Sequence, residues 1–325
     1  MHRPIAPSII VGMMIAGAVM GPSLAGAQGY PARPIRAVVA IGGGGEALGR
    51  LIAEKMSQAL GQPIVIDAQP AAGGAIAANT VARAAPDGYT LLYAAVNSQV
   101  YRTLLSKNVP YDPIRDFTPI GMMSDAVLAV AASNNSGIRS MTDLVARAKA
   151  DGGRLFYGTS GVGTTHHLSG EVFQSVASVR MTHVPYKDPN QVGVELMADR
   201  LPVGWGVFGT LHQNHLAGKL RIIAINNTTR FQRTPDIPTV GEQIPGYEPP
   251  PGWNAWFGPA GLPRNIVERL NAEVNRALAA PDLRDRIDAL GFIPTPGTPE
   301  ELAAELKRSL ANAARMVKAA GIEPE

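Results

Sequence analysis

The chain has 325 residues and a formal net charge of +3, with 46% hydrophobic and 17% charged residues. This apolar content excludes a mainly disordered chain, and the length is sufficient for two ordinary domains. The absence of cysteine excludes disulfides, thiol catalysis and cysteine-ligated metal centres. The small excess of positive charge gives no indication of a nucleic-acid partner.

Residues 1–27 have the pattern of a secretory signal peptide. Arg3 supplies a positive charge ahead of an apolar stretch from Ile9 to Val19, and Ala25-Gly26-Ala27 fits the small-x-small cleavage rule. An N-terminal membrane anchor is the alternative, but the apolar stretch is short and prolines bracket it. We therefore expect a chain that is exported and cleaved after Ala27.

The rest of the chain alternates short apolar strands with amphipathic helices. Helical spacing of apolar residues, cap signals at Ser140 and Thr298, and a stop signal at Gly61 delimit the helices. The proline-rich stretch Pro245–Gly252 predicts a crossing between domains. This rhythm predicts an α/β protein whose parallel sheets have helices on both faces. The expected strands are 34–41, 63–67, 89–94, 155–157 and 220–225, and the expected helices are 46–60, 75–84, 141–150, 165–175, 266–279 and 299–320.

The first candidate site is the loop Gly42–Glu46, which follows a strand and opens a helix. Such a loop directs backbone N–H groups and the positive end of a helix dipole at a ligand, so a small anion such as a carboxylate is favoured. Two alternatives remain. Asp67 ends the next strand as in a dinucleotide site, although the G-x-G-x-x-G spacing is not met. The glycines could also simply turn the chain.

The second candidate site is another strand, glycine-rich turn and helix start, residues 157–167. It offers hydroxyl groups beside free N–H groups. Ser160 could be a nucleophile, but Val162 stands where the G-x-S-x-G elbow requires glycine. His166 and His167 diverge by about 100° on a helix, so His167 is interpreted as a structural or ligand-contacting residue rather than a metal ligand. Phe208 either lines a pocket or packs locally.

Several phrases in register resemble the solute-binding proteins of tripartite tricarboxylate transporters, the Bug family. They extend over the whole chain that follows the predicted signal peptide. They are Tyr30-Pro31-x-Arg33-Pro34, Ala85-Pro86-Asp87-Gly88-Tyr89, Pro110-Tyr111-Asp112-Pro113, Tyr157-Gly158-x-Ser160-Gly161-x-Gly163-Thr164, Val184-Pro185-Tyr186-Lys187, Pro235-x-Ile237-Pro238-Thr239-Val240 and Pro259-Ala260-Gly261-x-Pro263.

The resemblance implies a two-lobed periplasmic binding protein of type II topology, with parallel or mixed sheets. Lobe one would comprise residues 28–128 and 252–325, and lobe two residues 129–251. A small organic carboxylate would bind between the lobes and pass to the membrane permease subunits of a tripartite transporter. A periplasmic monomer is expected, with no cofactor, metal or enzymatic activity. The ligand-binding residues implied by the resemblance or proposed above are Gly44, Gly45, Glu46, Ala47, Ser160, Gly163, Thr164, Thr165, His167 and Phe208.

Three positions depart from the family pattern. The first loop is two residues shorter and lacks a phenylalanine and a threonine, Asp188 replaces a glycine, and two family acids are missing from Pro202–Val207, one of them at Gly206. The loss of an acid at Gly206 disfavours an amino-acid ligand, and Glu46 leaves a cation as an alternative ligand. Two other functions stay open: a ligand sensor for a two-component receptor, and a secreted hydrolase that uses Ser160.

Overall fold

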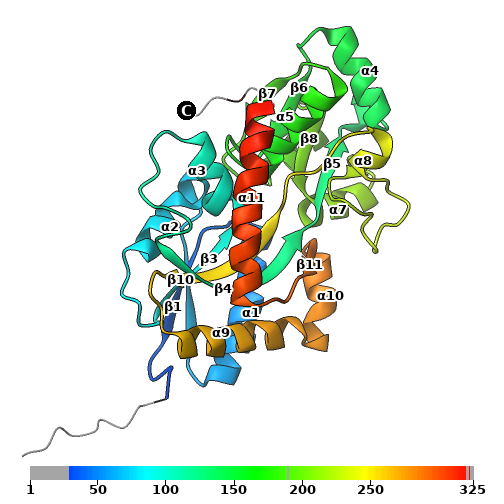
Figure 1. Cartoon of the computed structure of the whole chain (residues 1–325). Coiled ribbons are helices and arrows are strands. Elements are labelled where there is room, and N and C mark those ends of the chain that lie inside the picture. The colour runs from blue at the N-terminus through cyan, green and yellow to red at the C-terminus, as the bar shows by residue number, and fades with distance from the viewer. Residues whose placement is uncertain (1–28, 189, 320–321, 323–325) are drawn as a thin grey trace, which may run out of the picture.

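The computed structural model describes residues 29–188, 190–319 and 322 of the chain. The predicted signal peptide and its cleavage site lie outside these residues. Two sheets organise the described part (Figure 1). The first sheet has the strand order β11 (Phe292–Pro294), β4 (Phe117–Ala126), β10 (Trp253–Pro259), β3 (Thr90–Ala95), β1 (Ile35–Val39), β2 (Ile64–Ala68). The second has the order β7 (Thr182–Pro185), β6 (Phe156–Thr159), β8 (Val203–Val207), β5 (Leu128–Ala132), β9 (Arg221–Ile225).

The chain passes between the two sheets at two places. Strand β4 of the first sheet leads directly into β5 of the second, and the return runs from β9 through the proline-rich stretch to β10. Pro245–Gly252 therefore lies between strands of different sheets, as predicted. Strand β5 is antiparallel to β8 and β9, and β10 is antiparallel to β3 and β4. The sheets are mixed rather than purely parallel, because a strand that arrives from the other sheet enters in the opposite direction.

Helices cover both faces of each sheet, and successive residues of the strands are therefore buried on opposite sides. In the first sheet, Val38 packs in one buried cluster while its neighbours Ala37 and Val39 pack in another. In the second sheet, Val130 and Ala131 divide in the same way. The covering helices are α1 (Gly44–Leu60), α2 (Ala75–Ala82), α4 (Met141–Asp151), α5 (Thr165–Ala177), α6 (Gln191–Met197), α7 (Phe208–Leu216), α9 (Arg264–Leu278), α10 (Pro281–Ala289) and α11 (Pro299–Ala319).

The predicted helix signals have the expected local geometry. Ser140 Oγ accepts a hydrogen bond from the Asp143 N–H at the start of α4. Thr298 and Glu301 form the reciprocal bonds of a capping box before α11, at 2.7 and 3.1 Å. Gly61 ends α1 with a φ of 70°, a conformation that favours glycine. Short helical segments that the sequence did not predict include the single π turn η2 (Asn97–Tyr101), followed by α3 (Arg102–Leu105), and the 3₁₀ turn η1 (Ala71–Gly74).

Two features connect the two halves of the fold. Helix α11 contacts both β4 and α5, and runs alongside both sheets (Figure 1). The first turn of α7 lies against the turn before β11: a Cβ atom at Gly209 would lie only 2.2 Å from the Leu290 carbonyl oxygen. Only glycine permits this close approach. Among the helices that the structure describes, none has the length and apolar character needed to cross a bilayer.

Candidate functional site

A cavity of about 950 Å³ opens between the two sheets. Its floor is formed by the connections between them, with Ala126 and Leu128 on one and Gly252 and Asn254 on the other. Its walls are mostly apolar, and the segments that follow β1, β3, β6, β7 and β8 contribute to them. Ligand sites in open α/β sheets lie beyond the carboxyl ends of strands, where this cavity lies.

The loop after β1 brings the amino end of α1 to the cavity. Gly44, Gly45 and Glu46 line it, whereas Ala47 does not. Helix α1 has no side-chain cap: Gly43 precedes it and offers only its carbonyl, to the Ala47 N–H at 3.1 Å. The N–H groups of the first turn therefore keep their hydrogen-bonding capacity and the positive end of the helix dipole, which suits an anion. The Glu46 carboxylate is held by Arg50 on the next turn, at 2.6 and 3.0 Å.

The loop after β6 brings the amino end of α5 to the opposite wall. Ser160, Thr164 and Thr165 line the cavity, whereas Gly163 and His167 do not. This helix start is occupied by partners from the chain itself. Thr164 Oγ1 accepts from the His167 N–H at 3.2 Å. Thr165 donates from both its N–H and its hydroxyl to Asn97 Oδ1, at 3.0 and 2.7 Å.

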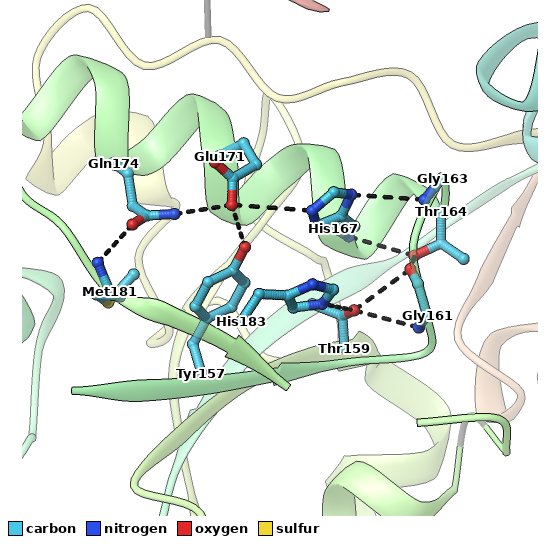
Figure 2. A network of polar contacts seen from close by, with 10 residues as sticks. All are labelled: Tyr157, Thr159, Gly161, Gly163, Thr164, His167, Glu171, Gln174, Met181 and His183. Carbon is cyan, nitrogen blue, oxygen red and sulfur yellow. Dashed lines mark hydrogen bonds and ion pairs between the residues drawn. The ribbon is translucent and has the colours of Figure 1, made fainter. Parts of the chain in front are cut away.

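A partly buried polar network supports this second loop from behind (Figure 2). Its centre is Glu171 on α5, which accepts hydrogen bonds from Tyr157 and, at 2.9 Å, from Gln174 Nε2. His167 Nε2 lies 3.9 Å from Glu171 Oε1, and its Nδ1 accepts a 3.5 Å bond from the Gly163 N–H. His167 thus has a structural position in this network, below the glycine-rich turn rather than in the cavity.

His183 extends the network from β7 to the loop. Its ring stacks on His167, with centroids 4.3 Å apart, and its Nε2 lies 2.6 Å from Thr159 Oγ1. Thr159 Oγ1 in turn accepts from the Gly161 N–H at 3.2 Å. Burial, with a contribution from His167, lowers the pKa of His183 to about 3, so this ring is neutral at neutral pH. The loop after β6 is consequently fixed by uncharged hydrogen bonds.

Ser160 and His166 form a contact that resembles a nucleophile and its base. Ser160 Oγ lies 2.6 Å from His166 Nδ1, and burial lowers the pKa of His166 to about 4. A catalytic triad needs an acid on the second ring nitrogen to orient the base. His166 Nε2 is buried and has no hydrogen-bond partner in the described part of the chain. The third member of a triad is therefore missing among the described residues.

Phe208 does not reach the cavity. It is 1% exposed, stacks on His212 and makes an edge-to-face contact with Phe231 within the core of the second sheet. Of the two alternatives left by the sequence, local packing is the one observed. The preceding residue, Val207, lines the cavity instead.

The cavity also contains residues that the sequence reasoning missed, above all Asn97 and Arg102 on the segment after β3. Asn97 comes three residues after the end of the predicted strand 89–94, so its place at the carboxyl edge of the sheet could have been inferred. Lys187 and Asp188, after β7, line the other wall and are exposed. The described residues contain no group of three or more His, Asp or Glu side chains placed to hold a metal ion.

Comparison with known proteins decides the family. Residues 48–322 match the family described as "Tripartite tricarboxylate transporter family receptor". The chain belongs to this family. It is 33% identical over 300 residues to a UPF0065 protein of Bordetella bronchiseptica, covering 92% of this chain and 89% of the relative. The resemblance found in the sequence motifs is thereby confirmed.

Solved structures confirm the two-lobed α/β fold. Rpa4515 of R. palustris with adipate superimposes with a TM-score of 0.86 at 30% identity, covering 91% of this chain and all of the other. MatC of Rhodopseudomonas palustris with bound malate gives a TM-score of 0.80 at 28% identity, covering 89% and 100%. The chain is thus a solute-binding protein of the tripartite tricarboxylate transporter class.

Proposed function

We propose that this protein captures a small organic carboxylate in the cleft between two lobes, in the periplasm, and delivers it to the membrane permease subunits of a tripartite transporter. The single observation that carries the ligand class is the uncapped amino end of α1 in the cleft wall. Support comes from the two similar proteins whose structures contain adipate and malate, both dicarboxylates.

In this proposal the lobes are residues 28–128 with 252–325, and residues 129–251. The ligand's carboxylate accepts from the N–H groups of Gly44, Gly45 and Glu46, while Ser160 and Thr164 approach it from the other lobe. Burial strengthens these charge-assisted bonds, and the apolar walls receive the hydrocarbon part of the ligand. Because the ligand contacts both lobes only when they are close together, it shifts the equilibrium toward closure. The closed form then docks on the permease as a monomer.

Ligand binding is tested by melting the purified protein against mono-, di- and tricarboxylates, with adipate and malate included. A ligand at 100 times its Kd adds about 2.7 kcal/mol to the free energy of unfolding, which raises Tm by a few degrees for a protein of this size. Small-angle scattering with the best acid should show a smaller radius of gyration. If no acid in the panel shifts Tm, and calorimetry with the same acids detects no binding, the proposal fails.

The hydrolase alternative has one observation in its favour, the Ser160–His166 contact. It predicts turnover of esters that is abolished by Ser160→Ala. In the proposal made here, Ser160 binds rather than attacks, so an ester panel should give no turnover, and Ser160→Ala should weaken acid binding only. Turnover that disappears in Ser160→Ala would contradict a purely binding role.

A further inference from the structure

Asn97 and Arg102 reach the cleft from one unusual turn of the backbone. The Arg102 N–H donates to the Asn97 carbonyl, the i to i+5 bond of a π turn. Both residues line the cavity. Single π turns are rare and are found frequently at functional sites. Here the turn holds an amide and a guanidinium close together on one wall, immediately after the carboxyl end of β3.

The hydrogen bonds of Asn97 determine how its amide is oriented. Thr165 donates twice to it, so the atom that faces Thr165 must be the acceptor Oδ1. The Nδ2 group, with two donors, is left without an acceptor in the described part of the chain. Since Asn97 lines the cavity, these donors are available to a ligand. Thr165 belongs to α5 on the second sheet, so Asn97 acquires this orientation only when the two halves of the fold lie together.

Arg102 contributes a positive charge that the cavity does not neutralise. Its Nε is buried without a hydrogen-bond partner, and none of the described acidic side chains forms an ion pair with it. Of the two acids in the cavity wall, Glu46 is already engaged by Arg50, and Asp188 is exposed and forms no ion pair with Arg102. Lys187 is another cation of the cavity, but it is exposed, so its field is more strongly screened by solvent than that of partly buried Arg102.

We propose that Asn97 and Arg102 form a second anion subsite, which receives the distal carboxylate of a dianionic ligand whose first carboxylate lies at the amino end of α1. The inference rests on the proposed function and adds the residues that select a dicarboxylate over a monocarboxylate. Asn97 also links selection to closure, because Thr165 orients its donors from the other half of the fold.

Asn97→Asp separates ligand contact from a structural role. The aspartate retains an acceptor for both Thr165 donors, so a merely structural Asn97 would tolerate it. A carboxylate in place of Nδ2 repels the distal acid of the ligand. Calorimetry should show adipate binding weakened at least tenfold, with hexanoate, which has the same chain length and one carboxylate, changed less than about threefold.

Arg102→Gln tests the guanidinium, and Lys107→Gln is the matched control. Lys107 is exposed, lies five residues further along and is absent from the cavity wall, so its replacement removes one positive charge without touching the cleft. Wild type should prefer adipate to hexanoate at least tenfold. Arg102→Gln should reduce that preference to about threefold or less, Arg102→Lys should restore part of it, and Lys107→Gln should leave it unchanged.

The possible failures are distinguishable. If wild type binds adipate tightly but both cleft variants keep its affinity and preference, the subsite is wrong while the proposed function stands. If wild type binds hexanoate as well as adipate, selection of a second acid is wrong. If wild type binds no carboxylate of the panel, the proposed function fails and the subsite fails with it. Circular dichroism melting of each variant confirms folding, and either cleft variant alone suffices for the test.

Discussion

The two glycine-rich loops of this protein look alike in sequence but differ in how many N–H groups at the following helix start already have a hydrogen-bond acceptor. Each follows a strand, opens a helix and lines the same cavity. At α1 no side chain caps the helix, and the only acceptor that Gly43 offers is its carbonyl, which takes the Ala47 N–H. At α5, Thr164 and Asn97 take the N–H groups of His167 and Thr165.

The difference indicates that the two helix starts have different roles in ligand binding. The start of α1 is prepared to receive charge, because binding a carboxylate there satisfies donors that are otherwise unpaired. At the start of α5 the N–H groups of Thr165 and His167 already have acceptors, and this turn rests on a partly buried network, so it presents hydroxyl groups at fixed positions. Four substitutions or titrations test this difference, beginning with the one expected to have the largest effect.

The largest effect is expected from a charge placed at the start of α1. Gly44→Asp puts a carboxylate where the ligand's carboxylate is proposed to bind, and a Cβ at this position has only ordinary contacts, at 3.5 Å from Leu290 O and Phe292 Cε2. Acid binding should weaken by about 100-fold, measured by calorimetry, although an acid in the first turn favours the helix itself. The isosteric Gly44→Asn is the control, and equal affinities in the two variants would contradict a carboxylate site at α1.

The second prediction uses pH to act on the α5 side of the cleft, through His166 on α5 and His183 on β7. His166 and His183 have folded pKa values of about 4 and 3, below the ordinary 6.5. Between pH 6.5 and the folded pKa of each histidine, the unfolded chain therefore binds more protons than the folded protein. The free energy of unfolding consequently decreases as the pH falls below about 6.5. The loss is up to about 1.4 kcal/mol per pH unit for each histidine. Urea unfolding between pH 7 and 4.5 measures it.

His183→Gln is the matched variant for this titration, since glutamine can still bond to Thr159. Its unfolding free energy should depend less steeply on pH than that of wild type. An identical slope in the two proteins would show that His183 does not stay neutral in the folded state.

A smaller effect is expected from removing the cap of α5. Thr164→Ala deletes the hydroxyl that accepts from the His167 N–H, which should lower the free energy of unfolding by about 1 kcal/mol. Ser140→Ala removes the equivalent cap of α4, outside the cavity wall. Both variants should lose similar stability in urea, but only Thr164→Ala should also weaken acid binding. Equal binding in both would place Thr164 outside the ligand site.

The smallest effect is expected from Glu46→Gln. Its carboxylate lies in the first turn of α1 but is paired with Arg50, so its repulsion of a bound anion is partly cancelled. Neutralising it should strengthen carboxylate binding by about two- to threefold, measured by calorimetry. Loss of binding in this variant would instead favour the alternative in which Glu46 holds a cation.

The sequence predicts both loops because glycine runs after apolar strands are local signals. The same signals do not reveal which helix start is occupied. That difference depends on Asn97, which is 68 residues away from Thr165 and bonds to it only in the folded chain. Arg102 is missed for a related reason: the π turn that precedes it, Asn97–Tyr101, has no recognisable sequence pattern. His167 and Phe208 are close in sequence to residues that line the cavity. Their side chains nevertheless lie elsewhere, His167 in the network around Glu171 and Phe208 in the core of the second sheet.

Gly209 sets a mechanical limit on the cleft. Its missing Cβ lets α7 rest directly on the Leu290 carbonyl, backbone against backbone. The distance between the two halves of the fold at this point is therefore determined by an absent atom. Even a methyl group at this position would push α7 away from the Leu290 carbonyl. A series of larger side chains would therefore keep the two halves of the fold progressively further apart, without altering any group that faces the ligand.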